Sequence, residues 1–417
     1  MRTTGLIGVI AAGATVLAAC GSSSGTAGAD SVTIVLNTPS GKMPFIGTFT
    51  QQGAKLAADE INKAGGITVG GKKYQVKLLA LDNGLSSTTS MDNVKRAVSE
   101  KAVAIIDDGY TARDTAKIAG DAGIPIMVDW DTTAELIDPT ARPNVYRIAP
   151  PNDSLSEHLA AYVAPKGLKL AIVHDDTEYA DDGVKHLTED FGKANARFDA
   201  DIELPSSATG YATQALQAKQ SGATGIVLWA QAPALAQFVK DYRAGGGTAK
   251  IFSGANAEDP IVRSQNADHP EYIEGLTYAT FRITTEGGPE AWNAFRGKYE
   301  DAALNNGEGE EKLDFKTPKG RTVVQPPDWQ IFPYDMVYLV KAALEKAGTV
   351  DTSGNKLIDA LNGITIKSAN GDNRGWTKDL HEGVVDDDIY FASFVDMKFK
   401  PVQDDPLSKT LPPLDQE

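Results

Sequence analysis

Cysteine and histidine are scarce in this chain of 417 residues, which contains one cysteine, Cys20, and five histidines. A single cysteine cannot form an intramolecular disulfide, so the hydrophobic cores alone must hold the fold together. The histidines are His158, His174, His186, His269 and His381. None of them shows the H-x-x-x-H spacing of a zinc site, so neither a metal nor another cofactor is predicted.

Basic residues are also few: the chain has 40 Lys and Arg against 56 Asp and Glu, which gives a formal net charge of −16. Binding to nucleic acid needs a basic surface, so nucleic acid is excluded as the expected partner. An anionic membrane surface would repel this chain as well.

The motifs of several enzyme classes are missing. The first expected strand is not followed by G-x-G-x-x-G, and the chain has neither a P-loop nor a G-x-S-x-G elbow. His174-Asp175-Asp176 is the one suggestive cluster, and aspartates at strand ends often only cap the next turn. We therefore expect a protein that is not an enzyme.

Long apolar runs are absent after the first 19 residues. Arg2 precedes an apolar stretch, Leu6 to Ala19, that is too short to span a bilayer, which is the pattern of an export signal. Leu17-Ala18-Ala19-Cys20 resembles the lipobox of bacterial lipoproteins, and a Gly/Ser tether follows it. We expect residues 1–19 to be a signal peptide, Cys20 to be lipidated and residues 20–30 to be a linker. The protein would then be extracytoplasmic and lipid-anchored to the cell membrane; the alternative is an ordinary cleaved signal with an incidental cysteine.

Short apolar runs alternate with amphipathic segments over the first half of the chain. The expected strands are 32–36, 74–81, 102–106 and 124–128, and the expected helices are 53–63, 91–100 and 111–119. Such alternation predicts an α/β lobe with a parallel sheet, whose ligands bind at the carboxyl ends of the strands.

The same rhythm restarts after Pro150-Pro151. Strands are expected at 168–174, 198–204, 225–229 and 251–253, and helices at 183–194, 211–219 and 234–244. Two further helices are expected at 290–303 and 333–347, with a polar surface insertion at 304–328 between them. The chain is thus predicted to form two α/β lobes joined by a hinge.

The segment 53–67, GAKLAADEINKAGGI, resembles the first-helix signature of the Leu/Ile/Val-binding family of extracellular solute-binding proteins. Leu81-Asp82-Asn83, Gly123-Ile124-Pro125, the segment 174–179 and Tyr334-Asp335 follow in the family's order. The resemblance implies a type I periplasmic-binding-protein fold, two Rossmann-like lobes joined by a hinge that the chain crosses three times. It assigns residues 31–149 and about 283–384 to lobe 1, 150–282 and about 385–400 to lobe 2, and 401–417 to a tail.

The same resemblance implies a function and a set of cleft residues. The function is capture of a small solute by a monomer that delivers it to the permease and ATPase subunits of an ABC importer. The alternatives are a sensory receptor for a membrane kinase and an extracellular hydrolase. The implied ligand-binding residues are Phe45, Tyr110, Thr111, Trp130, Thr132, Tyr179, Trp229, Gln231 and Asn256.

Several of these residues also have a purely structural interpretation. Phe45 is placed in the loop between the first strand and the first helix, as part of the cleft wall. Thr111 would serve equally as a helix N-cap, and Trp229 as a core residue.

Two residues depart from the family pattern. Trp130 stands near a position that is usually small, where it either reshapes the pocket or packs into the lobe surface. Ala255 or Asn256 replaces the glutamate that pairs with an amino acid's ammonium group. A buried ammonium without a partner costs several kcal/mol, so the solute is expected to be an amide, an aromatic acid or a cation as readily as a standard amino acid.

Overall fold

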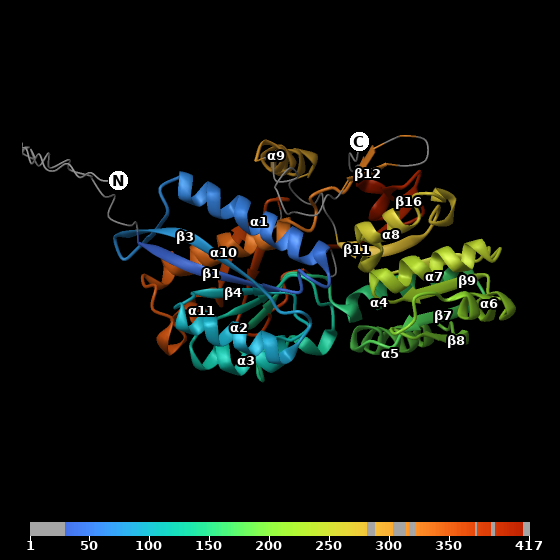
Figure 1. The fold of residues 1–417 in the computed structure, drawn as a ribbon, viewed down its shortest axis with the longest axis horizontal. Coiled ribbons are helices and arrows are strands. Elements are labelled where there is room, and N and C mark those ends of the chain that lie inside the picture. The colour runs from blue at the N-terminus through green and yellow to red at the C-terminus, as the bar shows by residue number, and fades with distance from the viewer. Residues whose placement is uncertain are drawn as a thin grey trace, which may run out of the picture.

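The computed structural model describes residues 30–281, 288–302, 314–316, 320, 322–371, 373–384 and 388–411. The expected signal peptide, Cys20 and nearly all of the linker lie outside these residues, as does most of the expected insertion at 304–328. Figure 1 shows two lobes side by side along the long axis of the molecule. No helix in the described part of the chain has both the length and the apolar character needed to cross a membrane.

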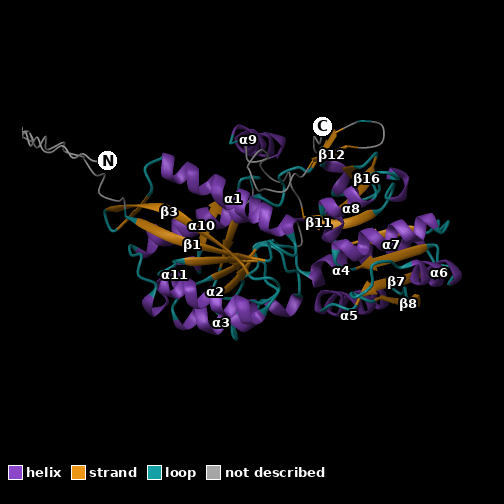
Figure 2. Ribbon diagram, viewed as in Figure 1, coloured by secondary structure: helices purple, strands orange, loops and turns teal. Residues whose placement is uncertain are grey.

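The first lobe is built on a six-stranded sheet in the order β2-β3-β1-β4-β5-β6. Its strands are β1 (Ser31–Thr38), β2 (Ile67–Val69), β3 (Lys72–Asp82), β4 (Ala104–Asp107), β5 (Ile126–Val128) and β6 (Val145–Arg147). All pairs are parallel except β2 with β3. Its helices are α1 (Pro44–Lys63), α2 (Ser87–Ser99), α3 (Ala112–Asp121), α10 (Ile331–Ala347) and α11 (Lys356–Leu361). Helices α1 and α10 lie on one face of the sheet and helices α2 and α3 on the other (Figure 2). Their apolar side chains pack against the sheet in two separate clusters.

The second lobe has a seven-stranded sheet in the order β17-β16-β11-β10-β9-β7-β8. Its strands are β7 (Leu170–Asp175), β8 (Phe198–Leu204), β9 (Gly225–Trp229), β10 (Lys250–Ser253), β11 (Thr277–Phe281), β16 (Ile389–Val395) and β17 (Lys398–Pro401). The first five are parallel, and β16 and β17 are antiparallel to their neighbours. Its helices are α4 (Asn152–Val163), α5 (Glu178–Lys193), α6 (Ala212–Gln220), α7 (Ala232–Ala244) and α8 (Pro260–Gln265). Helices α4 and α5 cover one face, and α6 and α7 cover the other.

Smaller elements complete the fold: α9 (Gly288–Asp301) and the hairpins β12–β13 (Asp314–Lys316, Thr322–Val324) and β14–β15 (Ile364–Lys367, Asn373–Trp376). The chain returns to the first lobe in α10 after β11, and to the second lobe in β16 after β15. The predicted fold class, two α/β lobes with parallel sheets, is confirmed. Residues beyond β17 pack on the second lobe, where the Phe391 N–H donates to Ser408 Oγ at 2.8 Å.

The first helix starts earlier than predicted. Helix α1 begins at Pro44 and not at residue 53, so Phe45 lies in its first turn and not in a loop. Proline suits this turn because it has no N–H to leave unpaired. Thr50 and Gln52 are polar, so they interrupt the apolar periodicity from which the helix was predicted, yet both are buried in the structure. The correction places Phe45 on α1, where its ring packs against those of Phe49 and Trp130.

Candidate functional site

The carboxyl ends of the two parallel sheets meet between the lobes. In each sheet the strand order reverses at one point, between β1 and β4 in the first lobe and between β7 and β9 in the second. Tyr110 lies in the loop after β4, and Gln231 lies after β9 as the N-cap of α7. The Tyr110 hydroxyl donates to Gln231 Oε1 at 3.0 Å and accepts from Trp130 Nε1–H at 3.0 Å. This hydrogen-bond chain therefore connects the two points at which open α/β sheets bind ligands.

A second contact closes the lobes along α5. Thr132 Oγ1 donates to Asn152 Oδ1 at 2.7 Å, and Asn152 Nδ2 donates to Asp182 Oδ2 at 2.9 Å. The same Asp182 oxygen accepts from the Ala134 N–H of the first lobe at 3.1 Å. Thr132 thus holds the first lobe to the residue that opens α4 and, through it, to α5.

Two ion pairs flank this contact. Arg113 Nη1 lies 2.7 Å from Glu178 Oε1, and Lys185 Nζ lies 3.0 Å from Glu135 Oε1. Both pairs join a side chain of the first lobe to one of α5. Because they are largely exposed to solvent, each contributes little to stability but fixes how the lobes face each other.

An aromatic cluster, defined here as Phe45, Phe49, Trp130 and Trp329, lies beside the Tyr110 hydroxyl. The Trp130 ring centroid is 6.0 Å from that of Phe45, 5.8 Å from Phe49 and 4.7 Å from Trp329. Trp329 precedes α10, and its Nε1–H donates to Glu258 Oε2 at 3.0 Å. Trp130 is therefore neither a solvent-exposed ring nor an isolated core residue, since its ring packs between α1 and the segment that enters α10.

Four aspartates gather at the carboxyl ends of β4 and β5. Asp107 accepts from Asn37 Nδ2 at 2.7 Å and from the Gly109 N–H at 2.8 Å, and burial raises its pKa to about 6. Asp108 accepts from Asn83 Nδ2 and from the Tyr110 N–H. Burial, followed by the charge of Asp107, raises the pKa of Asp108 well above its usual range.

The other two aspartates flank Trp130. Asp129 Oδ2 accepts from Thr50 Oγ1 at 2.6 Å, whereas its fully buried Oδ1 has no hydrogen-bond partner. Asp131 Oδ1 accepts from both the N–H and the hydroxyl of Thr133. Burial raises the pKa of both carboxyls. Among the described residues, no group of three or more His, Cys, Asp and Glu side chains is arranged to hold a metal ion.

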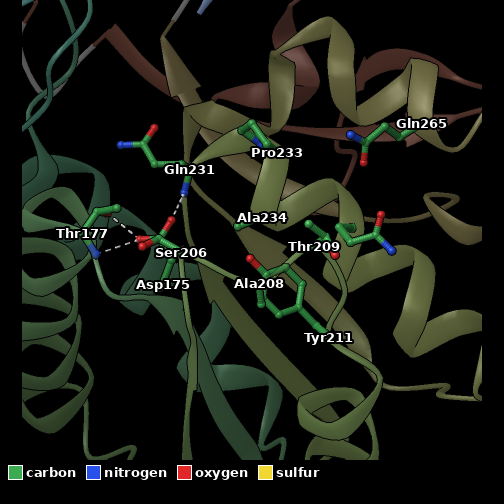
Figure 3. A pocket seen from close by; sticks show the side chains of 11 residues that line it. Asp175, Thr177, Ser206, Ala208, Thr209, Tyr211, Gln231, Pro233, Ala234 and Gln265 are labelled. Atoms are coloured by element: carbon green, nitrogen blue, oxygen red, sulfur yellow. Dashed lines mark hydrogen bonds between the residues drawn. The ribbon is translucent and has the colours of Figure 1, made fainter. Parts of the chain in front are cut away.

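A pocket of about 360 Å³ opens in the second lobe next to the interlobe contact. Figure 3 shows Asp175, Thr177 and Gln231 at one end of it and Tyr211 and Gln265 at the other. Asp175 Oδ2 accepts from the Gln231 N–H at 2.6 Å, so the strand end of β7 fixes the residue that Tyr110 contacts.

Comparison with known proteins decides the family. A family model described as periplasmic binding protein matches residues 33–398. This chain belongs to the periplasmic binding protein family. The Leu/Ile/Val-binding protein homolog 7 of Brucella abortus is 24% identical over 279 residues, which cover 62% of this chain and 68% of the relative.

Solved structures share the fold of this periplasmic binding protein. A type 1 periplasmic binding protein from Bordetella pertussis superposes with a TM-score of 0.75 at 18% identity, covering 89% of this chain and 100% of that one. The branched-chain amino acid transporter substrate-binding protein LivJ from Streptococcus pneumoniae, in complex with isoleucine, has a TM-score of 0.73 at 20% identity, covering 89% and 98%. An ABC-transporter solute-binding protein from Rhodopseudomonas palustris, in complex with 3,4-dihydroxybenzoic acid, has a TM-score of 0.71 at 19% identity, covering 89% and 95%.

The remaining predicted site residues of this periplasmic binding protein have partners within their own lobes. Thr111 stands at the N-cap of α3, but its hydroxyl donates to Ser90 Oγ at 2.7 Å and does not cap the helix. Asn256 Nδ2 donates to the Ala230 carbonyl at 3.2 Å. Trp229 is fully buried in the second lobe and stacks on Tyr179 at 5.9 Å. The structure therefore brings Tyr110, Thr132 and Gln231 into the contact between the lobes. Trp130 is bonded to Tyr110, and Phe45 packs on Trp130 within the first lobe.

Three residues of this contact escaped the sequence pattern: Asn152, Asp182 and Trp329. Asn152 directly follows Pro150-Pro151, a break that marks a passage between lobes, and this is the one signal that pointed to it. Asp182 reads as an ordinary polar position of an amphipathic helix. Trp329 is distant in sequence from Trp130, and only the return of the chain to the first lobe places the two rings together.

Proposed function

We propose that this protein captures a small solute, an amino acid or a related compound, between its lobes and delivers it to the membrane permease of an ABC importer. The hydrogen-bond chain from Trp130 through Tyr110 to Gln231 carries this proposal, because it joins the ligand-binding points of both sheets. Closure of the two lobes over a solute stabilises one state of the molecule, and a transporter can recognise that state.

The solute would replace part of the interlobe contact. Tyr110, Trp130, Thr132 and Gln231 provide hydroxyl, indole and amide groups, and Phe45 with the rest of the aromatic cluster provides an apolar wall. Tyr179 adds a buried hydroxyl from the second lobe. We place Trp229, Thr111 and Asn256 behind these residues as support, since their partners lie within one lobe.

The cellular setting follows the same proposal. Lipidation at Cys20, after removal of residues 1–19, would hold a monomer outside the cytoplasmic membrane. Residues 20–30 would tether lobe 1, made of residues 31–149 and about 283–384, while residues 150–282 and about 385–400 form lobe 2. The partners would be the permease and ATPase subunits, and no reaction would be catalysed.

A thermal-shift screen against amino acids, amides, amines, aromatic acids and sugars tests the binding step. A solute present at 1,000 times its Kd adds about 4 kcal/mol of stability, which raises the Tm visibly. A hit should also lower the radius of gyration in solution scattering. Deletion of the gene should then abolish uptake of that solute by cells; binding with unimpaired uptake would favour the sensory-receptor role instead.

A further inference from the structure

Arg147 is a fully buried cation at the point where the chain first leaves the first lobe. It ends β6, and the next helix, α4, belongs to the second lobe. Its Nε and Nη2 donate to the two carboxylate oxygens of Glu382, at 2.9 and 2.6 Å. The Glu382 side chain is only 20% exposed, so this bidentate pair is shielded from solvent and sets the guanidinium in one orientation. The pair joins two segments that lie 235 residues apart in the chain.

The segment that carries Glu382 leads into the last passage of the chain to the second lobe. The main chain of Arg147 pairs with residues 381–383 through two N–H···O bonds of 2.9 and 2.8 Å, which adds this segment to the sheet beside β6. Arg374 Nη1 donates to the last carbonyl of the same segment at 2.6 Å and to Asp388 Oδ2 at 3.0 Å. Asp388 directly precedes β16 of the second lobe. Two passages between the lobes are thus bonded to each other at Arg147.

The remaining donor of Arg147 holds the loop that contacts the second lobe. Nη1 donates to the main-chain carbonyl of Asp131 at 3.0 Å and to that of Thr133 at 2.8 Å. The residue between them, Thr132, faces the other way: its carbonyl accepts from the Asn152 N–H at 2.6 Å, and its hydroxyl donates to the Asn152 side chain. The two outer carbonyls of this loop therefore bond to Arg147, while the middle residue bonds to the second lobe.

The shape of the guanidinium explains why arginine occupies this position. Three nitrogens in one rigid plane donate to a carboxylate on one side and to two carbonyls on the other. A lysine ammonium is a single point at the end of a flexible stem, so it cannot reach both sides with the same geometry. The Arg147 side chain therefore transmits the position of Glu382 to the loop at 131–133 as a rigid connection.

We propose that Arg147 is a positioning residue for solute capture, because it holds Thr132 toward the second lobe and couples that orientation to the hinge through Glu382. This rests on the proposed function, in which Thr132 contacts the solute. Rotation of the lobes about their connecting segments displaces Glu382, and Arg147 passes that displacement to the loop at 131–133. The orientation of Thr132 and the angle between the lobes then change together.

Amide hydrogen exchange of the solute-free protein tests this role. Arg147→Lys should accelerate exchange of the Asn152 and Ala134 amides, which donate across the lobes, by about tenfold or more. The reference is the Ile105 amide, which donates to the Pro125 carbonyl at 3.0 Å inside the first lobe and should stay within about twofold. A role in stability alone would accelerate all three amides alike. That result, or no acceleration at all, would overturn the proposal.

Arg142→Lys is the matched control. Arg142 also donates to two main-chain carbonyls of the first lobe, from Nε to Leu136 at 2.9 Å and from Nη2 to Glu135 at 2.6 Å. It makes the same substitution without touching the carbonyls at either side of Thr132, so exchange of the Asn152 amide should change by less than about threefold. Equal acceleration by both variants would mean that loss of any nearby guanidinium loosens the contact, and that Arg147 has no special role.

Glu382→Gln tests the link to the hinge while keeping Arg147, and it decides alone if Arg147→Lys does not fold. It should accelerate exchange of the Asn152 amide by about threefold or more and leave the Ile105 amide within about twofold. Adding Arg147→Lys to it should accelerate the Asn152 amide by less than about threefold further, because the connection is already broken. Fully additive effects would overturn the coupling to the hinge. Because no solute is present, failure of these tests leaves solute capture standing, and a negative solute screen leaves the exchange result standing.

Discussion

Tyr110 is the side chain whose hydroxyl joins both lobes to the aromatic cluster. Replacing it by phenylalanine keeps the ring but removes the acceptor of Trp130 Nε1–H and the donor to Gln231 Oε1. A net hydrogen bond contributes about 1 kcal/mol, so Tyr110→Phe should shift the free protein toward the open state by about fivefold. Solution scattering should report a larger radius of gyration.

A matched variant shows whether this effect belongs to the interlobe contact. Tyr162→Phe also removes one phenol donor, which belongs to a partly buried side chain and bonds Asp404 at 2.7 Å away from the interlobe contact. It should leave the radius of gyration unchanged. If both variants behave alike, the Tyr110 hydroxyl does not hold the lobes together.

For single residues, the sequence predicts which side chains are polar or aromatic but not which partner each of them bonds. Trp130 was singled out because it departs from the family, and the structure places its indole in the interlobe chain. The hydroxyls of Thr111 and Thr132 were both predicted to bind the solute, yet one bonds within its lobe and the other reaches Asn152. That difference depends on which neighbour stands opposite each threonine, which local pattern cannot give.

Helix α5 and strand β9 pack so closely that one position admits only glycine. A Cβ built on Gly183 would lie 2.0 Å from Trp229 Nε1, a distance that no packed side chain tolerates. Gly183→Ala should therefore destabilise the protein by about 1–3 kcal/mol, measured by urea unfolding, although alanine is the better helix former.

Gly192 in the same helix is the control, because a Cβ there meets nothing within 4 Å. Gly192→Ala should stabilise the protein by a few tenths to about 1 kcal/mol. Opposite signs for the two variants identify packing as the cause. Stabilisation by both would mean that the Trp229 ring moves aside at little cost.

Elements with a clear apolar period were predictable, and those defined by distant partners were not. The buried strands β1, β4 and β9 and the amphipathic helix α10 follow the expected ranges closely. Strands β16 and β17 come from the end of the chain and join the second sheet antiparallel, which depends on where β11 leaves an open edge. Helix α4 was not predicted, because it begins directly after two prolines that were interpreted as a boundary between the lobes.

At the scale of the whole molecule, the proposed membrane anchor lies outside the two folded lobes, so its loss should not affect their folding. The described lobes begin at Asp30, and the proposed anchor is Cys20. Cys20→Ser should move the protein from the membrane fraction of cells to the soluble extracytoplasmic fraction, since one acylated residue is lost. Fractionation followed by immunoblotting measures this. The thermal unfolding of the variant should match that of the wild type, and retention in the membrane fraction would contradict lipidation at Cys20.

The segment that leads into α10 ties the second lobe to the first through two buried carboxyls. Trp329 Nε1–H donates to Glu258, and the Trp329 N–H donates to Asp328 Oδ1 at 3.0 Å. Both carboxyls are fully buried. Burial raises the pKa of Asp328 to about 7, and burial together with the charge of Asp328 raises that of Glu258 well above its usual range. Two carboxylates cannot both ionise there at low cost, so the folded state keeps protons that the unfolded chain has released.

This arrangement predicts a fall in stability with rising pH. Unfolded aspartate has a pKa of about 3.9, so below about pH 4 the group is protonated in both states and its stabilising contribution is intact. Between about pH 4 and pH 7 the folded state binds the extra proton, and the free energy of unfolding decreases as pH rises. Asp328→Asn removes this titration and keeps the acceptor for Trp329. Its urea midpoint relative to that of the wild type should therefore rise between pH 5 and pH 8.

The exposed carboxylate of Asp268 in the same lobe gives the control, because Asp268→Asn makes the same substitution away from the crossing. Its urea midpoint should follow that of the wild type across the whole range. The difference between Asp328→Asn and the wild type should exceed about 1 kcal/mol at pH 8, since one pKa unit corresponds to about 1.4 kcal/mol. A difference that stays constant from pH 5 to pH 8 would mean that Asp328 is ionised in the folded protein. The segment that leads into α10 would then carry a buried charge at Asp328, close enough to Glu258 to raise the pKa of that carboxyl.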